Sequence, residues 1–451
     1  MKVQYLKRML IGLGLAMVLA VPWASATNYY VVASSQQPSP TWPWTNWGWA
    51  HTNLIEVVAA ARDNDTVYVT NNQTYYLTNQ VTVSYAITVR SWGPGRIMDP
   101  SNTILSGRYP DATNRHFQLT NSGATVAGFT LTKGCESNGG SILLQNGMVT
   151  NCTIVSNYAQ NNGGNGGGLY IGGSGSGGVW NCVISDNTTS NFGAGIHIQS
   201  GGPWQIANCR ISGGTAYNYG GGILANSATA GTIISNCWVV SNYARSYSGG
   251  IALYNAECHN SFIMGNTADL NQGGGIRIVG QNLLRNCLIA NNICLSSSLD
   301  NSGGGIAANA GLIQNCTIVS NSVPLGAGGI RLFGSAKFEN TIIWGNSGGG
   351  TYSNWYITAG ASTFTNCCTS PNIVSAFATA VNTITNDPRF VNNATNFQLQ
   401  SDSPCINAGV NQDWMEGAKD LYGYRRIDNF RKTVDIGAYE YLSKGTVFIG
   451  H

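Results

Sequence analysis

Charged residues are scarce in this sequence. They make up 9% of its 451 residues, whereas a conventional globular domain carries roughly 25%. Disorder does not account for the scarcity, because a hydrophobic fraction of 43% is enough to bury a core. With 58 glycines as well, the composition favours a stacked β-architecture.

Apolar runs long enough to span a membrane are absent beyond the N-terminus. There, Lys2, Lys7 and Arg8 precede an apolar run over residues 9–21, and Ala24-Ser-Ala26 follows as a small-x-small cleavage site. This order predicts a secretory signal over residues 1–26 and an exported mature chain. A membrane anchor is the alternative, and the shortness of the run counts against it.

The mature chain also lacks net charge. The formal net charge is +3, and the signal contributes three basic residues and no acid, so its removal leaves a neutral chain. A neutral surface gives no electrostatic reason to expect nucleic acid or anionic lipid as a partner.

One short pattern recurs along the chain: an apolar residue, any residue, Asn, a small residue, any residue and an apolar residue. The copies contain Asn151, Asn181, Asn208, Asn236, Asn260, Asn286, Asn315, Asn340 and Asn366. Successive asparagines are 30, 27, 28, 24, 26, 29, 25 and 26 residues apart. A second pattern alternates with the first, two small residues followed by Ile or Leu, as in Gly-Gly-Ile330-Arg-Leu332. A unit of about 27 residues with short alternating runs is typical of one coil of a parallel β-helix.

The asparagine of each repeat is predicted to be a corner. Its apolar neighbours lie two residues before and one residue after it, an odd offset that puts them on opposite faces of a straight strand. Both face inward only if the chain turns at Asn, the non-glycine residue most tolerant of left-handed backbone. Stacked coils would place these side chains in a hydrogen-bonded ladder along a rod segment of about 38 Å. We therefore expect Asn236→Ala to lower the unfolding free energy by about 1–3 kcal/mol.

Twelve cysteines in an exported chain would normally indicate disulfides. Seven of them follow a corner asparagine directly, at a position where Ser261 and Thr341 also occur: Cys152, Cys182, Cys209, Cys237, Cys287, Cys316 and Cys367. A position that accepts Ser or Thr needs a small side chain, so we expect a ladder of buried, mostly free thiols. Cys368 and Cys405 are a candidate pair near the C-terminal end, and the pairing of Cys135 and Cys294 stays open.

Both ends of a parallel β-helix expose strand edges and therefore need caps. Residues 53–62 predict a capping helix, because Asn53 and Glu56 have the spacing of a capping box ahead of an apolar stripe. Trp42, Trp44, Trp47 and Trp49 precede this helix. We expect them to form a hydrophobic plug over the first coil, and a sugar-stacking platform is the alternative.

Two stretches resemble known families. The run from Tyr29-Tyr-Val31 through Thr45-Asn-Trp47 to Thr88-Val-Arg90, with residues 126–131 after it, resembles bacterial right-handed β-helix repeat proteins of the pectate-lyase-like superfamily. The C-terminal part is similar to the choice-of-anchor Q domain of such proteins. Its matching motifs are Asp387-Pro-Arg-Phe390, residues 403–409, residues 420–423, Arg426 and residues 434–440, with Arg425 where the pattern usually has Pro.

Repeats and resemblance together predict an all-β, single-stranded, right-handed parallel β-helix with a short N-terminal capping helix. The expected segments are a signal (1–26), an N-terminal cap with the first coils (27–125), the regular β-helix (126–380), a choice-of-anchor Q-like cap (381–441) and a tail (442–451). We expect Asp420, Arg426, Asp435 and Glu440 to pair internally and fix the C-terminal cap.

Acidic residues are too few for the usual β-helix chemistry. The resemblance implies either a carboxylate cluster for Ca²⁺ beside an Arg or Lys base, or clustered aspartates. Residues 126–380 contain six acids, namely Glu136, Asp186, Glu257, Asp269, Asp300 and Glu339. Two of them, Asp269 and Asp300, share a loop position in consecutive coils, which their role in initiating turns explains. We therefore predict no catalytic residue, no metal ligand and no cofactor.

The strand that follows the glycines presents the most polar outward row. That row reads Tyr170, His197, Leu224, Ala252, Arg277, Ala307 and Arg331. Together with Tyr254 in the next outward row, the candidate substrate-binding residues are His197, Tyr254, Arg277 and Arg331. An acidic or neutral glycan would suit this face, and a solvated surface is the alternative.

The leading hypothesis is an exported, non-catalytic β-helix of the cell surface or extracellular space that acts in adhesion or polysaccharide contact. The alternative is a polysaccharide lyase or glycoside hydrolase with an atypical site around His197, Arg277 and Arg331 on the Gly-Gly-Ile strand face.

Overall fold

The computed structural model describes residues 25–34, 40–93, 102–160, 163–199, 202–226, 231–349, 353–427 and 432–442. Most of the predicted signal and of the predicted tail lie outside these ranges. Within them, no helix has the length and apolar character needed to cross a membrane.

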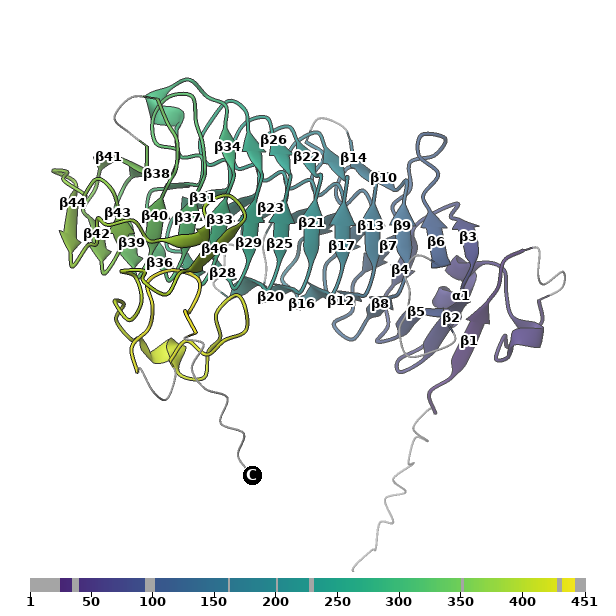
Figure 1. The fold of residues 1–451 in the computed structure, drawn as a ribbon. Coiled ribbons are helices and arrows are strands. Elements are labelled where there is room, and N and C mark those ends of the chain that lie inside the picture. Colours follow the sequence, from purple (N-terminus) through teal and green to yellow (C-terminus); the bar gives the residue numbers. More distant parts are fainter. Residues whose placement is uncertain are drawn as a thin grey trace, which may run out of the picture.

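The chain winds through short strands that stack, coil upon coil, into four parallel sheets (Figure 1). Within the described ranges, sheet A has 14 strands, sheet B 12, sheet C 11 and sheet D 7, and β45 and β46 form a separate antiparallel pair. One coil visits A, then B, then D where it is present, and then C before it returns to A.

Sheet A contains β1 (Asn28–Val31), β2 (Thr66–Thr70), β5 (Thr88–Trp92), β8 (Thr125–Ala127), β12 (Gly147–Thr150), β16 (Gly177–Trp180), β20 (Trp204–Ala207), β24 (Thr232–Ser235), β28 (Ala256–His259), β32 (Leu283–Arg285), β36 (Leu312–Gln314), β39 (Lys337–Glu339), β42 (Ser362–Thr365) and β44 (Ala378–Val381). Sheet B contains β3 (Gln73–Tyr76), β6 (Thr103–Ser106), β9 (Thr130–Thr132), β13 (Thr153–Val155), β17 (Val183–Ser185), β21 (Arg210–Ser212), β25 (Trp238–Val240), β29 (Phe262–Met264), β33 (Leu288–Ala290), β37 (Thr317–Val319), β40 (Ile342–Trp344) and β43 (Cys368–Thr369).

Sheet C contains β4 (Val81–Val83), β7 (Phe117–Leu119), β11 (Ile142–Leu144), β15 (Leu169–Ile171), β19 (Ile196–Ile198), β23 (Ile223–Asn226), β27 (Ile251–Tyr254), β31 (Ile276–Val279), β35 (Ile306–Ala308), β38 (Ile330–Phe333) and β41 (Trp355–Ala359). Sheet D contains β10 (Cys135–Glu136), β14 (Tyr158–Ala159), β18 (Thr188–Thr189), β22 (Thr215–Ala216), β26 (Tyr243–Ala244), β30 (Thr267–Ala268) and β34 (Ile293–Cys294). The remaining elements are α1 (Leu54–Ala60), the 3-10 turns η1 (Trp47–Trp49), η3 (Leu299–Asn301) and η4 (Asp413–Met415), and the strands β45 (Phe390–Asn392) and β46 (Asn396–Leu399).

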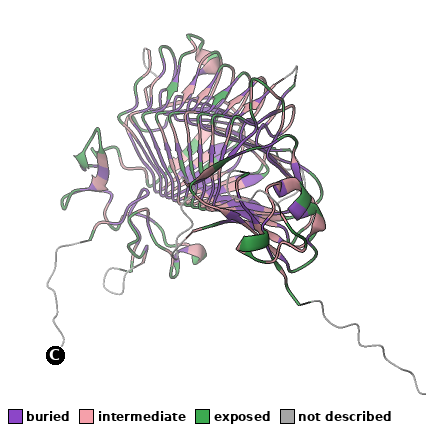
Figure 2. Cartoon of the chain, turned by 90° about the vertical axis from the view of Figure 1, so that its right-hand side faces the viewer, coloured by how far each residue is buried: buried purple, intermediate pink, exposed green. Residues whose placement is uncertain are grey.

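Alternate residues of each strand point into the coil and build one continuous core (Figure 2). In sheet C, for example, Ile223, Ile251 and Ile276 are Cα partners in neighbouring coils, and all three are fully buried. Repetition of the same inward residue type lets identical side chains stack, so each coil buries its apolar face against the next.

The corner asparagines are confirmed in their backbone role. All nine have a positive φ, between 48° at Asn315 and 55° at Asn208, and each stands between a sheet A strand and a sheet B strand. Their side chains do not form the ladder that we expected. Asn181, Asn208 and Asn236 are exposed to solvent, and only a few direct contacts link one corner amide to another, as between Asn286 and Asn260 at 2.7 Å.

A second set of asparagines forms the buried ladder instead, where the chain turns after the strands of sheet B; its last member, Asn354, precedes β41 of sheet C. Its members are Asn157, Asn187, Asn242, Asn266, Asn292, Asn321, Asn346 and Asn354. Asn266 shows the unit: its Nδ2 donates to the Val239 carbonyl and to Asn292 Oδ1, both at 2.9 Å. Its own Oδ1 accepts from the backbone N and the Nδ2 of Asn242, both at 3.0 Å. Every polar atom of the buried amide is therefore paired within the described coils.

The thiol ladder is confirmed. All twelve cysteines are buried and free, and ladder members such as Cys237 donate to a carbonyl two residues earlier, that of Ser235 at 3.2 Å. Cys368 and Cys405 lie against each other as free thiols, and the hydrogen-bonding contact with Cys405, which favours the neutral Cys368 thiol, together with burial raises the pKa of Cys368.

The N-terminal capping helix is confirmed as α1. Asn53 is its N-cap, with Oδ1 accepting from the Ile55 backbone N at 3.0 Å, and Glu56 accepts from Asn53 Nδ2 at 2.7 Å. The prediction that the four tryptophans form a hydrophobic plug over the first coil is wrong for most of them. Trp44 packs partly against the core, whereas Trp42 and Trp49 are 59% and 47% exposed.

The segment from residue 381 onward differs in placement from the expected end cap. It runs back along the side of the later coils, as Figure 1 shows. Its Phe390, Phe397 and Ile436 pack against outward residues of sheet B, including Leu288 and Ile342. This apolar cover explains why those two outward residues are buried.

Hydrogen bonds tie this C-terminal segment to the corner asparagines. Asn340 exchanges two bonds with the Val410 backbone, at 2.8 and 2.9 Å, and Asn366 donates to the Ala408 carbonyl at 3.1 Å. The expected internal pairing holds for Arg426 and Glu440, whose charged atoms are 2.8 Å apart. Asp420 and Asp435 instead accept hydrogen bonds from backbone N–H groups of the same segment.

The two asparagine sets predict different mutational costs. Asn266→Ala should lower the unfolding free energy by about 3 kcal/mol, because it leaves buried groups of Asn242, Val239 and Asn292 without partners. Asn236→Gly, which keeps the left-handed corner and removes an exposed amide, should change it by less than about 0.5 kcal/mol. Urea unfolding followed by far-UV circular dichroism measures both. Equal losses in the two variants would contradict this division.

Candidate functional site

The predicted site on sheet C is only partly assembled. Arg277 and Tyr254 come together: the guanidinium donates to the Tyr254 hydroxyl and lies 4.6 Å from the ring centroid of Tyr247 and 5.7 Å from that of Tyr219. The tyrosine rings 219 and 247 stack on each other with centroids 4.8 Å apart. Arg277 is therefore held inside an aromatic cluster of its own chain.

Arg331 does not face solvent. It is 3% exposed, its Nη2 donates to Asp300 Oδ1 at 3.0 Å, and its Nη1 donates to the Leu332 carbonyl and to Thr358 Oγ1, each at 2.6 Å. Burial lowers the pKa of Arg331, and Asp300 opposes that shift. Because Arg331 is buried and both of its Nη atoms already donate to groups of the same chain, it has little left to offer a ligand.

His197 is not an exposed base, which corrects the sequence interpretation. It is fully buried between the rings of Tyr170 and Phe192, with centroids at 5.3 and 5.8 Å, and among the described residues neither ring nitrogen has a hydrogen-bond partner of normal geometry. Burial lowers its pKa to about 3. The outward position is covered because the loop that carries Phe192 folds over sheet C.

A more open row of side chains lies on the outer face of sheet A. It consists of the residues directly before the corner asparagines and their Cα partners in earlier coils, and we call it the sheet A row. Its members are Tyr30, Tyr68, Arg90, Ala127, Thr150, Trp180, Ala207, Ser235, His259, Arg285, Gln314, Glu339, Thr365 and Val381. Sequence reasoning missed this row, although the residue before each corner asparagine was a sufficient signal to find it.

Aromatic rings gather at the N-terminal end of the sheet A row. Tyr30 stacks on Tyr68 with centroids 5.6 Å apart, and Trp47 and Trp92 pack edge-on against these tyrosines at 4.4 and 5.0 Å. The Arg90 guanidinium lies 5.8 Å from the Tyr68 centroid. Trp92 stays 41% exposed, so the cluster presents aromatic surface to solvent.

Trp180 lies in the middle of the row. A Cβ added to Gly178 would come within 2.8 Å of Trp180 Nε1, so the indole lies back over this glycine. A hollow of about 480 Å³ adjoins it, lined also by Met148 and Gln205. Trp180 Nε1 and Arg90 Nε have no hydrogen-bond partner among the described residues. Both atoms are buried, so the row offers a ligand its ring surface and its partly exposed side chains instead.

Besides Arg90 and the tyrosines, the titratable groups of the row lie towards its other end. His259 Nε2 is 3.0 Å from Glu257 Oε2, and a hollow of about 380 Å³ lies beside Glu257. Burial lowers the pKa of His259, the adjacent Glu257 opposes the shift, and Arg285 on the next strand adds to it. The imidazole is therefore neutral at neutral pH.

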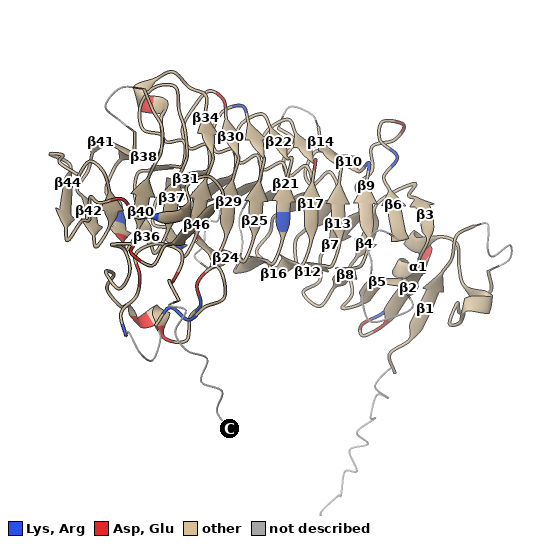
Figure 3. Cartoon of the chain, viewed as in Figure 1, with Lys and Arg blue, Asp and Glu red and all other residues tan. Residues whose placement is uncertain are grey.

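The C-terminal segment closes the row beyond Arg285. The Arg285 guanidinium lies 4.5 Å from the Trp414 ring and donates to Gln314, which in turn donates to Glu339 at 2.9 Å. Gln412 also donates to Glu339. Figure 3 shows how few charges the coils carry outside this region and the loops. The open part of the row therefore ends near His259.

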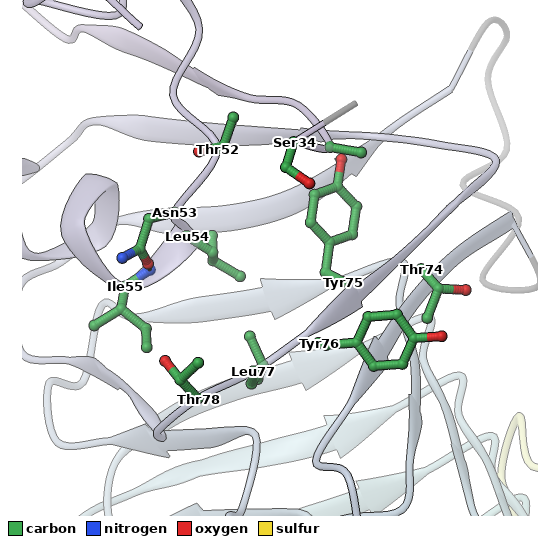
Figure 4. A pocket seen from close by; sticks show the side chains of 11 residues that line it. Ser34, Thr52, Asn53, Leu54, Ile55, Thr74, Tyr75, Tyr76, Leu77 and Thr78 are labelled. Atoms are coloured by element: carbon green, nitrogen blue, oxygen red, sulfur yellow. The ribbon is translucent and has the colours of Figure 1, made fainter. Parts of the chain in front are cut away.

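Another pocket, of about 300 Å³, lies between α1 and β3 at the N-terminal end (Figure 4). Its Tyr75 hydroxyl bonds to Thr70 within the chain, at 2.5 Å to Oγ1, and burial raises the pKa of Tyr75 to about 12. Because that hydroxyl is already paired, the pocket is a gap under the capping helix rather than a second polar site. In the part of the chain that the structure covers, no three His, Cys, Asp or Glu side chains are grouped to hold a metal ion.

Comparison with known proteins agrees with this architecture. Residues 115–294 match the family model described as a right handed beta helix region. The chain is a right-handed parallel β-helix. This confirms the fold class that the repeats and the resemblance together predicted, including its hand.

Similarity to individual proteins is distant. No curated protein matches the sequence. Solved structures similar to it include pectate lyase Pel9A, with 14% identity and a TM-score of 0.45 over 92% of this chain and 97% of that one. An alginate lyase from Paenibacillus sp. str. FPU-7 has 16% identity and a TM-score of 0.38 over 74% and 99% of the two chains. Similarity at this level carries no information about activity.

The buried histidine gives a test of stability against pH. The folded-state pKa of His197, about 3, lies below its unfolded value of about 6.5, so the unfolded chain binds the extra proton first. Stability from this group is present above pH 6.5 and is lost as the pH falls towards 3. His197→Phe, which keeps an aromatic ring against Tyr170 and Phe192, should flatten the loss by up to about 1.4 kcal/mol per pH unit. Chemical unfolding of both proteins from pH 8 to pH 4 measures the slopes, and parallel slopes would show that His197 is accessible to protons.

Proposed function

We propose that this β-helix is an exported, non-catalytic protein that contacts polysaccharide along the sheet A row. The observation that carries the proposal is the row itself: half-buried aromatic rings, with the 41% exposed Trp92 beside them, and polar side chains share a single face at the strand spacing of about 4.8 Å. A linear polymer with apolar ring faces and many hydroxyls suits such a surface, because aromatic rings take up the former and polar donors the latter.

Low charge supports binding through rings and hydroxyls rather than through ion pairs. Charged residues are 9% of the chain, and in the open part of the row Arg90 and His259 are the titratable members besides the tyrosines. Export is part of the proposal, on the strength of the signal pattern in residues 1–26. The identity of the segment after residue 381 as a choice-of-anchor Q domain is likewise proposed from its motifs.

A second candidate function is favoured by the Glu257–His259 pair. A neutral imidazole held by a carboxylate, with an arginine on the next strand, is able to accept a proton from a bound sugar ring. This is the lyase or hydrolase alternative, now placed on sheet A instead of on the Gly-Gly-Ile face. Incubation with a panel of polysaccharides, analysed for unsaturated and reducing ends, tests it. Turnover that His259→Ala abolishes would establish the enzyme and reject the non-catalytic role.

The binding proposal predicts which variants lose affinity. Tyr68→Ala and Trp180→Ala should each weaken polysaccharide binding about fivefold, because each removes one aromatic contact worth roughly 1 kcal/mol. Tyr217→Ala is the matched control, since its ring is 52% exposed on the sheet D side, outside the row. Affinity electrophoresis through gels that contain plant, algal or bacterial polysaccharides measures all three. Retardation that is unchanged in both row variants would reject the proposal.

A further inference from the structure

A separate cleft lies on the other side of the corner, where the coils meet the C-terminal segment. It has a volume of about 480 Å³ and is lined by Asn236, Trp238, Asn260, Phe262 and the loop 419–423. We call it the corner cleft. The volume is within the range of small-molecule sites, which is roughly 300–1,000 Å³.

One wall of the corner cleft is aromatic. Trp238 and Phe262 are Cα partners on the outer face of sheet B, and their rings stack with centroids 4.1 Å apart and planes 18° from parallel. Phe262 therefore covers one face of the indole, while 44% of Trp238 stays exposed. Tyr422, from the loop, adds a third ring that is 56% exposed.

The position of this wall is informative. In later coils the same outward row of sheet B holds Leu288 and Ile342, and the C-terminal segment buries both. The cover ends at Phe262, which packs at its margin. Trp238 is thus the first large apolar side chain of this row beyond the cover, and packing against the segment does not account for it.

The corner amides provide the polar side of the cleft. Asn286, Asn340 and Asn366 bond to the C-terminal segment. Asn236 is exposed, and its side chain makes no hydrogen bond to another described residue. Asn260 accepts from Asn286 at 2.7 Å and keeps its own NH₂ group for another partner.

Charge contributes little to this site. The Asp420 carboxylate already accepts from the backbone N–H groups of Tyr422, Tyr424 and Glu440, at 2.8 to 2.9 Å. Lys419 is the single cationic residue of the lining. A ligand with a carboxylate or phosphate would find no opposed pair of cations here, whereas a hydroxyl-rich neutral ring finds amide donors and acceptors next to an aromatic face.

We propose that the corner cleft binds one pyranose ring of a neutral glycan, stacked on Trp238 with its hydroxyls on Asn236 and Asn260. The site is distinct from the sheet A row, because it lies beyond the corner and takes a single ring rather than a length of chain. Its test therefore uses small probes that the row would not hold.

Saturation-transfer difference NMR on the full chain, with the methyl α- and β-glycosides of glucose, galactose, mannose and xylose, tests the proposal. We expect transfer to at least one glycoside. Trp238→Ala should abolish it, and Asn236→Gly should weaken it about tenfold, through loss of one hydrogen-bonding group. Tyr217→Ala and Tyr68→Ala are controls that should keep the parent signal.

Each outcome decides between the sites. Absence of transfer from all glycosides, or transfer unchanged in Trp238→Ala, would overturn the proposal. Loss in Tyr68→Ala with retention in Trp238→Ala would assign the sugar to the sheet A row and reject the cleft. Two variants serve as checks in case the alanine variant misfolds. Trp238→Phe keeps the local packing, and Asn236→Gly keeps the corner conformation. Their thermal unfolding midpoints are compared with that of the parent chain.

Discussion

Stacking of one coil on the next depends on hydrogen bonding between polar groups that water cannot reach. Backbone ladders in four sheets supply most of it, and the asparagine amides at the bend that follows the strands of sheet B supply the rest. Each such amide forms hydrogen bonds with the coil before it and with the coil after it. It therefore fixes the register of the coils and also pairs the polar groups of the bend. The outer faces of the sheets inherit that register, which is why the side chains of the sheet A row line up.

Local periodicity predicted the coil, its corners and its inward residues. The odd offset around Asn236 and its counterparts required a turn, and a left-handed Asn is what the structure has. The ladder of free thiols was also predicted, because the cysteines occupy equivalent positions in successive coils. Ser261 and Thr341 occupy the same position in other coils, so the fold does not require a disulfide there. These successes share a cause: each depends on residues within one coil and on its nearest neighbour.

The sequence did not reveal which outward side chains are buried by segments from elsewhere in the chain. Alternation places His197 and Arg331 on the outer face correctly, yet the loop with Phe192 and the side chain of Asp300 bury them. The same applies to corner residues such as Asn340, which are buried only because a segment 70 residues later folds back over them. The sheet A row was not predicted for a simpler reason. The glycines mark the strands of sheet C, whereas the row is marked by the residue directly before each corner asparagine.

A solenoid of near-identical turns has an ambiguity that ordinary domains lack. If one half of the rod slipped past the other by a whole repeat, many of the isoleucines, thiols and amides would still stack on a residue of their own kind. The C-terminal segment, which runs back along the coils, removes this ambiguity. Arg426 donates to Asn286, the Val410 backbone exchanges hydrogen bonds with Asn340, and the Ala408 carbonyl accepts from Asn366. The segment therefore fixes the register of the whole stack, because its contacts with Asn286, Asn340 and Asn366 form together only when the correct number of coils separates these residues.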